Sequence, residues 1–180
     1  MGVVLSLFQI KDKAMKFLLQ MLLFFCIGTT FSQTKYAELT PQGFAPVTFE
    51  TPNKTNEKLI EAARGWADYY NKKGYDVYDV TENSLKIDAW RENGYFTRSL
   101  GERYDFNIKY TLLIDFQADK KYTLTFILKE VYNKTVLSKT TVADFFTPDG
   151  KLKEDFEEVK PSLEATANRI MKSFADFIDN

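Results

Sequence analysis

The feature that most constrains the fold is a run of strict alternation in the middle of the chain. From Tyr104 to Phe116 every second residue is apolar or aromatic, and most residues between them are polar. Successive side chains of a β-strand point to opposite faces of a sheet, so the run predicts one long strand with one buried and one wet face. A helix would scatter these aromatic residues around its circumference. The chain must therefore contain a sheet that is covered on one face.

The long strand is followed by a second one. After a short polar link at residues 117–121, alternation resumes with Tyr122, Leu124, Phe126 and Leu128. A link of this length joins antiparallel neighbours, so the two strands are predicted to form a hairpin. Shorter β patterns lie at residues 47–49, 75–80 and 85–89.

The segments between the strands have weaker patterns. We expect Glu92–Gly94 to form a turn and Arg98–Arg103 to form a polar connection around Gly101. Residues 133–147 suit either an edge strand or a covering loop, and the pattern leaves both open.

Two amphipathic helices flank these strands. The first is predicted to begin at Thr55 or Asn56, either of which can cap it, and to end before Gly74. The second follows Pro161, which a first helical turn tolerates. Apolar residues recur at helical spacing in both segments. They are Leu59, Ala63, Trp66, Ala67 and Tyr70 in the first, and Leu163, Ile170, Met171, Phe174, Phe177 and Ile178 in the second.

These elements predict the fold class. Each helix has one apolar stripe and each long strand has one apolar face, so the simplest burial places both helices on the same face of a single antiparallel sheet. We therefore predict an α+β fold, a meander of about four to six strands in the order β-α-β-β-β-β-α, as one domain over residues 45–180.

The N-terminal residues have the pattern of a secretory signal peptide. A lysine-rich segment precedes the apolar run Phe17–Ile27, and small residues lead to an expected cleavage site after Ser32. The run is too short to cross a bilayer as a helix. We expect export to the periplasm or the exterior, no membrane anchor after cleavage, and an exposed leader over residues 33–44. Met15 is a more typical start for the signal peptide 1–32 than the first residue.

The residue types restrict the chemistry. The chain has no His, and its only Cys, Cys26, lies inside the apolar run and would be removed with it. The exported chain would lack the usual general base, thiol nucleophiles, thiolate zinc sites and disulfides. The net charge is −1 and no basic block occurs, which disfavours nucleic-acid binding. We expect no enzyme activity, no catalytic residue, no metal and no cofactor.

Trp90 is the candidate binding residue. By alternation it shares a face with Lys86 and Asp88, away from the apolar residues of the same strand. The simpler interpretation is that a bulge turns Trp90 inward or that residues 133–147 cover it. If the face is open, the indole is suited to stacking on a sugar ring or packing against a partner chain. Leu113, Ile127 and Val131 would then extend an apolar strip on the same face.

The chain resembles a family of secreted bacterial proteins described only as a domain of unknown function with a TATA-binding-protein-like fold. The resemblance rests on the signal peptide ending at Ser32, the helix bearing Trp66, the hairpin of Tyr104–Phe116 and Lys121–Tyr132, and the closing helix. It implies this fold over about residues 45–180 and a location in the envelope, and it brings no catalytic residue. A single, slightly acidic copy does not suit DNA bending, for which TATA-binding protein uses a doubled basic sheet.

The function predicted from these observations is that of a non-enzymatic binding or interaction domain of the envelope. Its open sheet face would contact a second copy, an envelope protein or a glycan. Two alternatives remain. One is a hydrolase of envelope polysaccharide that uses a pair of carboxylates among strand residues such as Asp88, Asp105, Asp115 and Glu130. The other is a carrier that holds a small apolar ligand between the helices and the sheet.

Overall fold

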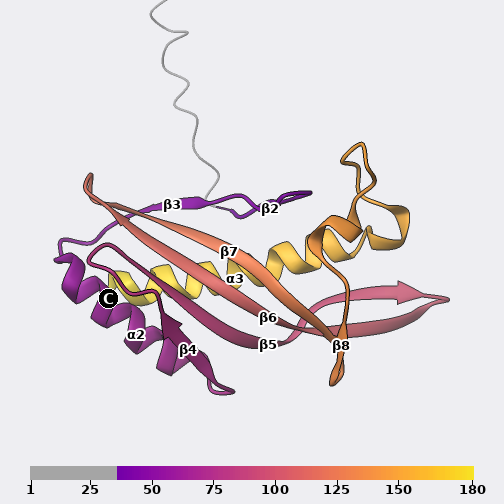
Figure 1. Cartoon of the computed structure of the whole chain (residues 1–180), viewed down its shortest axis with the longest axis horizontal. Coiled ribbons are helices and arrows are strands. Elements are labelled where there is room, and N and C mark those ends of the chain that lie inside the picture. Colours follow the sequence, from indigo (N-terminus) through magenta and orange to yellow (C-terminus); the bar gives the residue numbers. More distant parts are fainter. Residues whose placement is uncertain (1–35) are drawn as a thin grey trace, which may run out of the picture. The chain divides into compact units, whose positions relative to one another are not determined.

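The computed structural model describes residues 36–180 (Figure 1). The predicted signal peptide, 1–32, and the beginning of the predicted leader lie outside the described residues. Within the described part, no helix is long and apolar enough to cross a membrane.

A single antiparallel sheet dominates the described part of the chain. Its strands are β3 (Val47–Glu50), β4 (Tyr75–Tyr78), β5 (Ser84–Ser99), β6 (Glu102–Gln117), β7 (Lys121–Asn133) and β8 (Val136–Ser138). They lie in the order β3–β7–β6–β5–β4, and β8 pairs with β7 (Figure 1). A separate two-stranded sheet precedes it, formed by β1 (Leu39–Thr40) and β2 (Gly43–Phe44). The predicted antiparallel meander is confirmed.

Both helices cover one face of this sheet. They are α2 (Asn56–Tyr70) and α3 (Val159–Asp179), and both lie behind the strands in Figure 1. Thr55 caps α2, because its side chain accepts a hydrogen bond from the backbone N–H of Lys58. Two short 3₁₀ turns, η2 (Val142–Phe145) and η3 (Glu154–Phe156), lie between β8 and α3. The predicted α+β fold with two helices on one face is confirmed.

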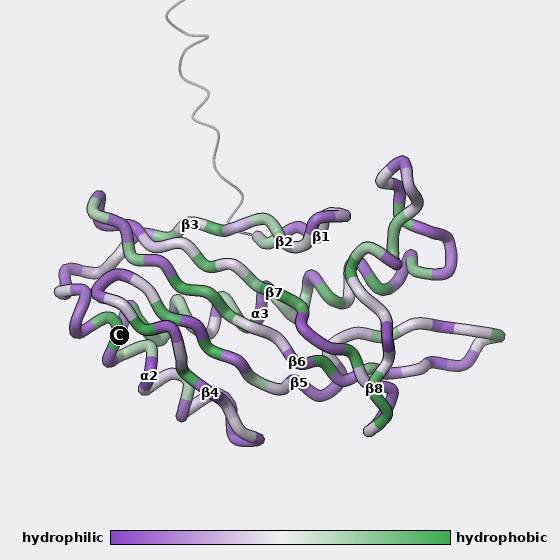
Figure 2. Tube along the Cα trace, in the orientation of Figure 1, coloured by the Kyte–Doolittle hydropathy of each residue, from purple (hydrophilic) through white to green (hydrophobic). Residues whose placement is uncertain are grey.

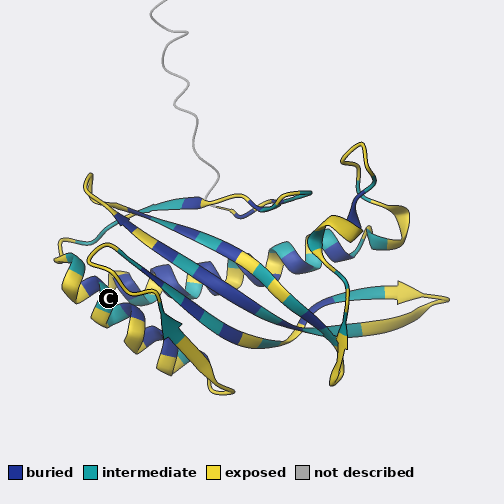
Figure 3. Ribbon diagram, in the orientation of Figure 1, coloured by how far each residue is buried: buried dark blue, intermediate teal, exposed yellow. Residues whose placement is uncertain are grey.

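The core lies between the helices and the sheet and is rich in aromatic side chains. Trp66 of α2 contacts Phe174 of α3 edge to face, with ring centroids 5.2 Å apart, and Phe174 also contacts Tyr122 of β7 at 5.9 Å. All three side chains are fully buried. The core lies on this face because apolar, buried positions alternate along the strands with polar, more exposed ones (Figures 2 and 3).

The expected turn at Glu92–Gly94 is wrong, because β5 continues through it as a strand of 16 residues. The extra residues form a β-bulge, with a register shift between Arg91 and Tyr95 against β6. Asn93 has a φ of 50°, and a Cβ atom on Gly94 would lie 2.6 Å from Cγ1 of Ile108. The bulge therefore needs a residue without a side chain at position 94.

The hairpin of β5 and β6 differs from expectation in two further ways. The predicted connection Arg98–Arg103 is almost entirely strand, and only the tight turn at Leu100 and Gly101 joins β5 to β6. Tyr104, at the start of the alternating run, is 46% exposed instead of buried. The end of this hairpin projects beyond α3 (Figure 3), so the helix does not cover Tyr104.

A second bulge lies in β7. Lys109 of β6 pairs with Glu130 and Tyr110 pairs with Leu128, which leaves Lys129 without a partner in the register. One extra residue inverts the alternation beyond it, so Val131 is buried. The expectation that Val131 extends an outer apolar strip is therefore wrong.

Residues 133–147 combine the two structures that the sequence left open. Val136–Ser138 form the short edge strand β8, paired with the end of β7. The residues that follow turn into η2, whose Phe145 is buried against Tyr95 with ring centroids 5.9 Å apart. The segment is thus first a strand and then a cover over the base of the β5–β6 hairpin.

The expectation of an exposed leader over residues 33–44 is wrong for its described part, 36–44. Ala37, Leu39 and Phe44 are buried. Phe44 packs edge to face on Phe126 of β7, with ring centroids 5.0 Å apart. The segment is held because its apolar side chains complete the core at the edge of the sheet.

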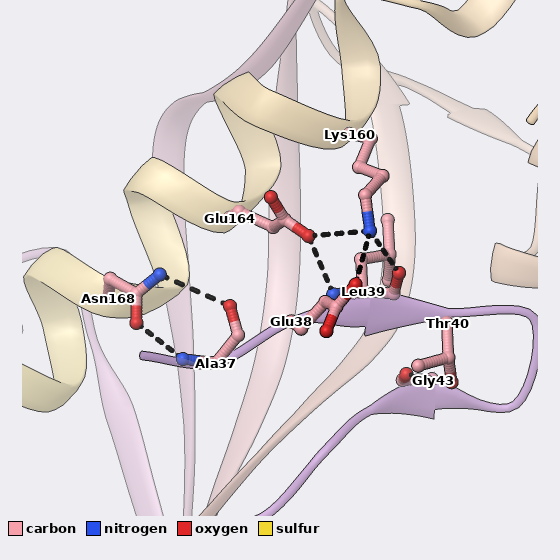
Figure 4. Close-up of polar contacts among 8 residues, drawn as sticks. All are labelled: Ala37, Glu38, Leu39, Thr40, Gly43, Lys160, Glu164 and Asn168. Atoms are coloured by element: carbon pink, nitrogen blue, oxygen red, sulfur yellow. Dashed lines mark hydrogen bonds and ion pairs between the residues drawn. The ribbon is translucent and has the colours of Figure 1, made fainter. Parts of the chain in front are cut away.

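Polar side chains of α3 hold the backbone of the same segment (Figure 4). Asn168 accepts a hydrogen bond from the N–H of Ala37 at 2.6 Å and donates one to its carbonyl at 3.2 Å. Glu164 accepts from the N–H of Leu39 at 2.8 Å, and Lys160 donates to the carbonyl of Leu39 at 2.8 Å. These three side chains, one helical turn apart, form what we call the α3 clamp.

Candidate functional site

The predicted binding residues Lys86, Asp88 and Trp90 lie on the face of β5 that points away from the helices. Each alternates with a buried residue of the same strand. The bulge in β5 begins after Arg91, so it does not turn Trp90 inward, and the indole is 38% exposed. The simpler interpretation of the sequence is wrong on this point. Trp90 is partly covered instead by Tyr132, with ring centroids 4.5 Å apart and planes tilted by 42°.

Lys86 and Asp88 belong to a polar cluster beside β4, not to the surroundings of Trp90. Oδ1 of Asp88 accepts hydrogen bonds from the hydroxyls of Tyr78 at 2.9 Å and Thr111 at 2.5 Å. Nζ of Lys86 lies 2.7 Å from Oδ2 of Asp79, and this hydrogen bond raises the pKa of Lys86. Tyr78 belongs to β4 and Asp79 follows it directly, so the cluster joins β4 to the sheet.

Trp90 and Tyr132 form an aromatic pair flanked by charges. The Tyr132 hydroxyl donates a hydrogen bond to the Glu130 carboxylate, which raises the pKa of Tyr132. Lys109 of β6 is the register partner of both Trp90 and Glu130. The pair therefore offers two aromatic rings with an ammonium and a carboxylate group in the neighbouring register positions.

A polar groove of about 750 Å³ lies next to the aromatic pair. Asn107, which lines it, is the register partner of Tyr132. The lining residues come from the β5 bulge, the start of β6 and the β7–β8 turn. They are Glu92, Asn93, Arg103, Tyr104, Asp105, Asn107, Asn133, Lys134 and Thr135.

Hydrogen bonds fix the polar groups of this groove before any ligand is present. Arg103 donates to Oδ1 of Asp105 from Nε at 2.9 Å and from Nη2 at 2.6 Å, and its guanidinium lies 4.1 Å from the ring centroid of Phe96. Asn107 accepts from the N–H of Asn93 at 3.1 Å and donates to the carbonyl of Lys134 at 3.0 Å. Fixed donors and acceptors lose less conformational entropy when a ligand binds.

The groove contains two carboxylates, Glu92 and Asp105. Glu92 is ion-paired to Lys73 and Asp105 to Arg103. Both carboxylates of the groove therefore have a cationic partner within the chain. Among residues 36–180, no three His, Cys or acidic side chains are placed to hold a metal ion.

Sequence analysis missed Tyr132 because the β7 bulge changes the face on which it lies. The sequence did contain a signal for this bulge. Strict alternation from Tyr122 would place Glu130 on the buried face, where an unpaired carboxylate is costly. An extra residue at Lys129 moves Glu130, and with it Tyr132, to the outer face.

Comparison with known proteins gives the fold but no function. No family model and no curated protein matches the chain. A TBP-like protein from Parabacteroides distasonis superposes with a TM-score of 0.57 at 15% identity, over 76% of this chain and 92% of that chain. A DUF4468 family protein from Bacteroides ovatus superposes with a TM-score of 0.53 at 10% identity, over 81% and 88%. The chain therefore has the TBP-like fold, and the resemblance inferred from the sequence is confirmed at the level of the fold.

Proposed function

We propose that the protein is a non-enzymatic binding domain of the bacterial envelope that binds a glycan on its outer sheet face. The observation that carries this proposal is the position of Trp90. Its indole is partly exposed and packs against Tyr132 at a tilt, and it stands next to a groove of fixed polar groups. Large aromatic side chains that remain accessible on a sheet favour a binding role.

A glycan fits this surface in two respects. One face of a pyranose ring is formed by C–H groups and stacks on an aromatic ring, and its rim carries hydroxyls that both donate and accept hydrogen bonds. The aromatic pair would take the C–H face. The carboxylate of Asp105, the amide of Asn107 and the guanidinium of Arg103 would take the hydroxyls.

Export is part of the same proposal. It is supported by the apolar run Phe17–Ile27 behind a lysine-rich segment, which is typical of a signal peptide. Export would bring the outer face into contact with envelope polysaccharides. Fractionation of the producing bacterium, with the protein detected by antibody, would test the location.

The binding test compares Trp90→Ala with Leu100→Ala. Leu100 is a fully exposed apolar residue at the turn between β5 and β6 and serves as the matched control. We expect the wild-type protein to bind members of an array of bacterial polysaccharides and muropeptides, and Trp90→Ala to weaken this binding about tenfold, because one aromatic stack contributes up to about 1.5 kcal/mol. Leu100→Ala should bind as the wild type does.

Two results would contradict the proposal. The first is glycan binding that is unchanged in Trp90→Ala. The second is a wild-type protein that binds no glycan but self-associates in sedimentation, with the association lost in Trp90→Ala. In that case the face would be a protein interface.

A further inference from the structure

One edge of β7 is paired at both ends and open in the middle. β3 pairs with Lys121–Leu124, and β8 pairs with Val131–Asn133. Between them, Thr125–Glu130 has no strand partner on this edge within residues 36–180. At about 3.4 Å per residue, the open stretch is about 20 Å long.

The chain preceding β3 explains why the edge is open. The pairing of β3 with β7 begins at Val47. Pro46, the residue before it, has no N–H to donate to the ladder. The N–H of Ala45 donates to the carbonyl of Glu38 at 3.0 Å, within the β1–β2 hairpin. The chain thus leaves the β7 ladder at Pro46, and the hairpin completes its own hydrogen bonds while β2 remains in contact with β7.

The hydrogen-bond pattern identifies the unpaired groups. The N–H of Thr51 donates to the carbonyl of Lys120 at 2.8 Å, at the start of the β3–β7 pairing. Along an antiparallel strand, alternate residues direct both backbone groups to the same side. The even-numbered residues of this part of β7 therefore face β3, and by continuation Phe126 and Leu128 direct their N–H and C=O groups to the open edge.

The pairing of β5 with β6 gives the same assignment. The N–H of Phe116 donates to the carbonyl of Asn83 at 2.7 Å, so even-numbered residues of β6 face β5 and odd-numbered ones face β7. Thr111 is an odd-numbered residue, and its register partner is Ile127. The backbone groups of Ile127 are thus engaged with β6, and those of its neighbours on either side point away from β6.

A groove of about 380 Å³ runs beside the open edge. Residues Pro41–Phe44 of the β1–β2 hairpin form one wall, and Thr140–Ala143 contribute to the lining as well. The α3 clamp fixes the segment that leads into this hairpin (Figure 4), so the wall is held in place without a ligand. Ile127 lines the groove and is 39% exposed.

We propose that this groove binds an extended peptide of about four to six residues with an acidic side chain, which pairs with the open edge of β7 between β3 and β8. The unpaired backbone groups of Phe126 and Leu128 would receive the peptide backbone. Lys129 is the only charged side chain that lines the groove, and it has no ion pair within the described residues, so it favours an acidic partner.

A single peptide fits this edge better than a second copy of the chain. The open stretch is bounded by β3 at one end and by β8 at the other. The same strands flank β7 in a second copy, so pairing two such edges would bring the flanking strands of both copies together. An isolated strand has no flanking strands and avoids this collision.

The test measures amide hydrogen exchange of the protein by NMR with the acetylated and amidated hexapeptide TVTVET at millimolar concentration. The N–H groups of Phe126 and Leu128 should exchange at least about tenfold more slowly with the peptide, because they gain hydrogen bonds. The N–H of Ile127, already bonded to β6, should not change. The same peptide with every backbone amide N-methylated should give no protection, because neither of its edges can then donate hydrogen bonds to β7.

A charge variant tests the acidic preference. Lys129→Glu should weaken peptide binding by about two- to fivefold, as expected for an exposed ion pair. Lys58→Glu, on the exposed face of α2, is the matched control and should bind as the wild type does.

Two results would overturn the proposal. One is exchange of Phe126 and Leu128 that the peptide does not alter. The other is protection of both amides that rises with protein concentration without peptide, which would assign the edge to self-association. Trp90→Ala should retain peptide binding, so failure here is distinguishable from failure of the proposed glycan site.

Discussion

Gly94→Ala should destabilise the protein because the β5 bulge brings Ile108 against position 94. The added Cβ would lie 2.6 Å from Cγ1 of Ile108 and 2.8 Å from both Cδ1 and Cγ2. Ile108 is fully buried and cannot swing out of the way. Overpacking of this kind costs about 1–3 kcal/mol, which corresponds to a decrease in Tm of about 2–12 °C for a domain of this size. Urea unfolding followed by tryptophan fluorescence measures the loss.

Two further variants make the reasoning specific. Ile108→Ala removes all three clashing atoms, so Gly94→Ala should cost much less in that background than in the wild type. Gly65→Ala, in the middle of α2, places a Cβ no closer than 3.7 Å to Phe177 and should stabilise the protein by about 0.5–1 kcal/mol. Equal effects of Gly94→Ala in both backgrounds would refute the account of the bulge.

Two remaining predictions concern the α3 clamp and the buried tyrosines. Asn168→Ala removes both hydrogen bonds to Ala37 and should cost about 1–3 kcal/mol, with faster amide exchange at Ala37; unchanged exchange would contradict the clamp. Burial raises the pKa of Tyr95, Tyr110 and Tyr122 above the usual 10.0. Because the folded pKa is the higher one, their contribution to stability is complete below about pH 10 and is lost as the pH rises above it. In an alkaline titration at 295 nm these phenols should ionise only together with unfolding, and their ionisation in the folded protein would count against this packing.

The sequence predicts the elements and their layers because both depend on periodic burial. The alternating run up to Phe116 and the stripe around Trp66 each specify one face to be covered, and a single sheet with both helices on one side satisfies them. This physical argument does not depend on the detailed register of the strands. It fails at Tyr104, where the strand extends beyond the helix that would cover it.

The site was harder to predict because it depends on two bulges and on backbone contacts. The β5 bulge replaces an expected turn, and the β7 bulge brings Tyr132 to Trp90. The α3 clamp binds N–H and C=O groups of Ala37 and Leu39, which every residue type has, so no pattern in the leader indicates it. The charged residue Glu130, at a position that strict alternation would bury, was the signal in the sequence for the β7 bulge.

The most direct test of the central claim, one sheet face covered by helices and the other open to solvent, is acrylamide quenching of tryptophan fluorescence. Trp66 of α2 is fully buried in the core between the helices and the sheet, and Trp90 is partly exposed on the outer face. Trp66→Phe, which retains only Trp90, should show strong quenching, and Trp90→Phe, which retains only Trp66, should show almost none. Protection of Trp90 to the same degree as Trp66 would contradict the claim.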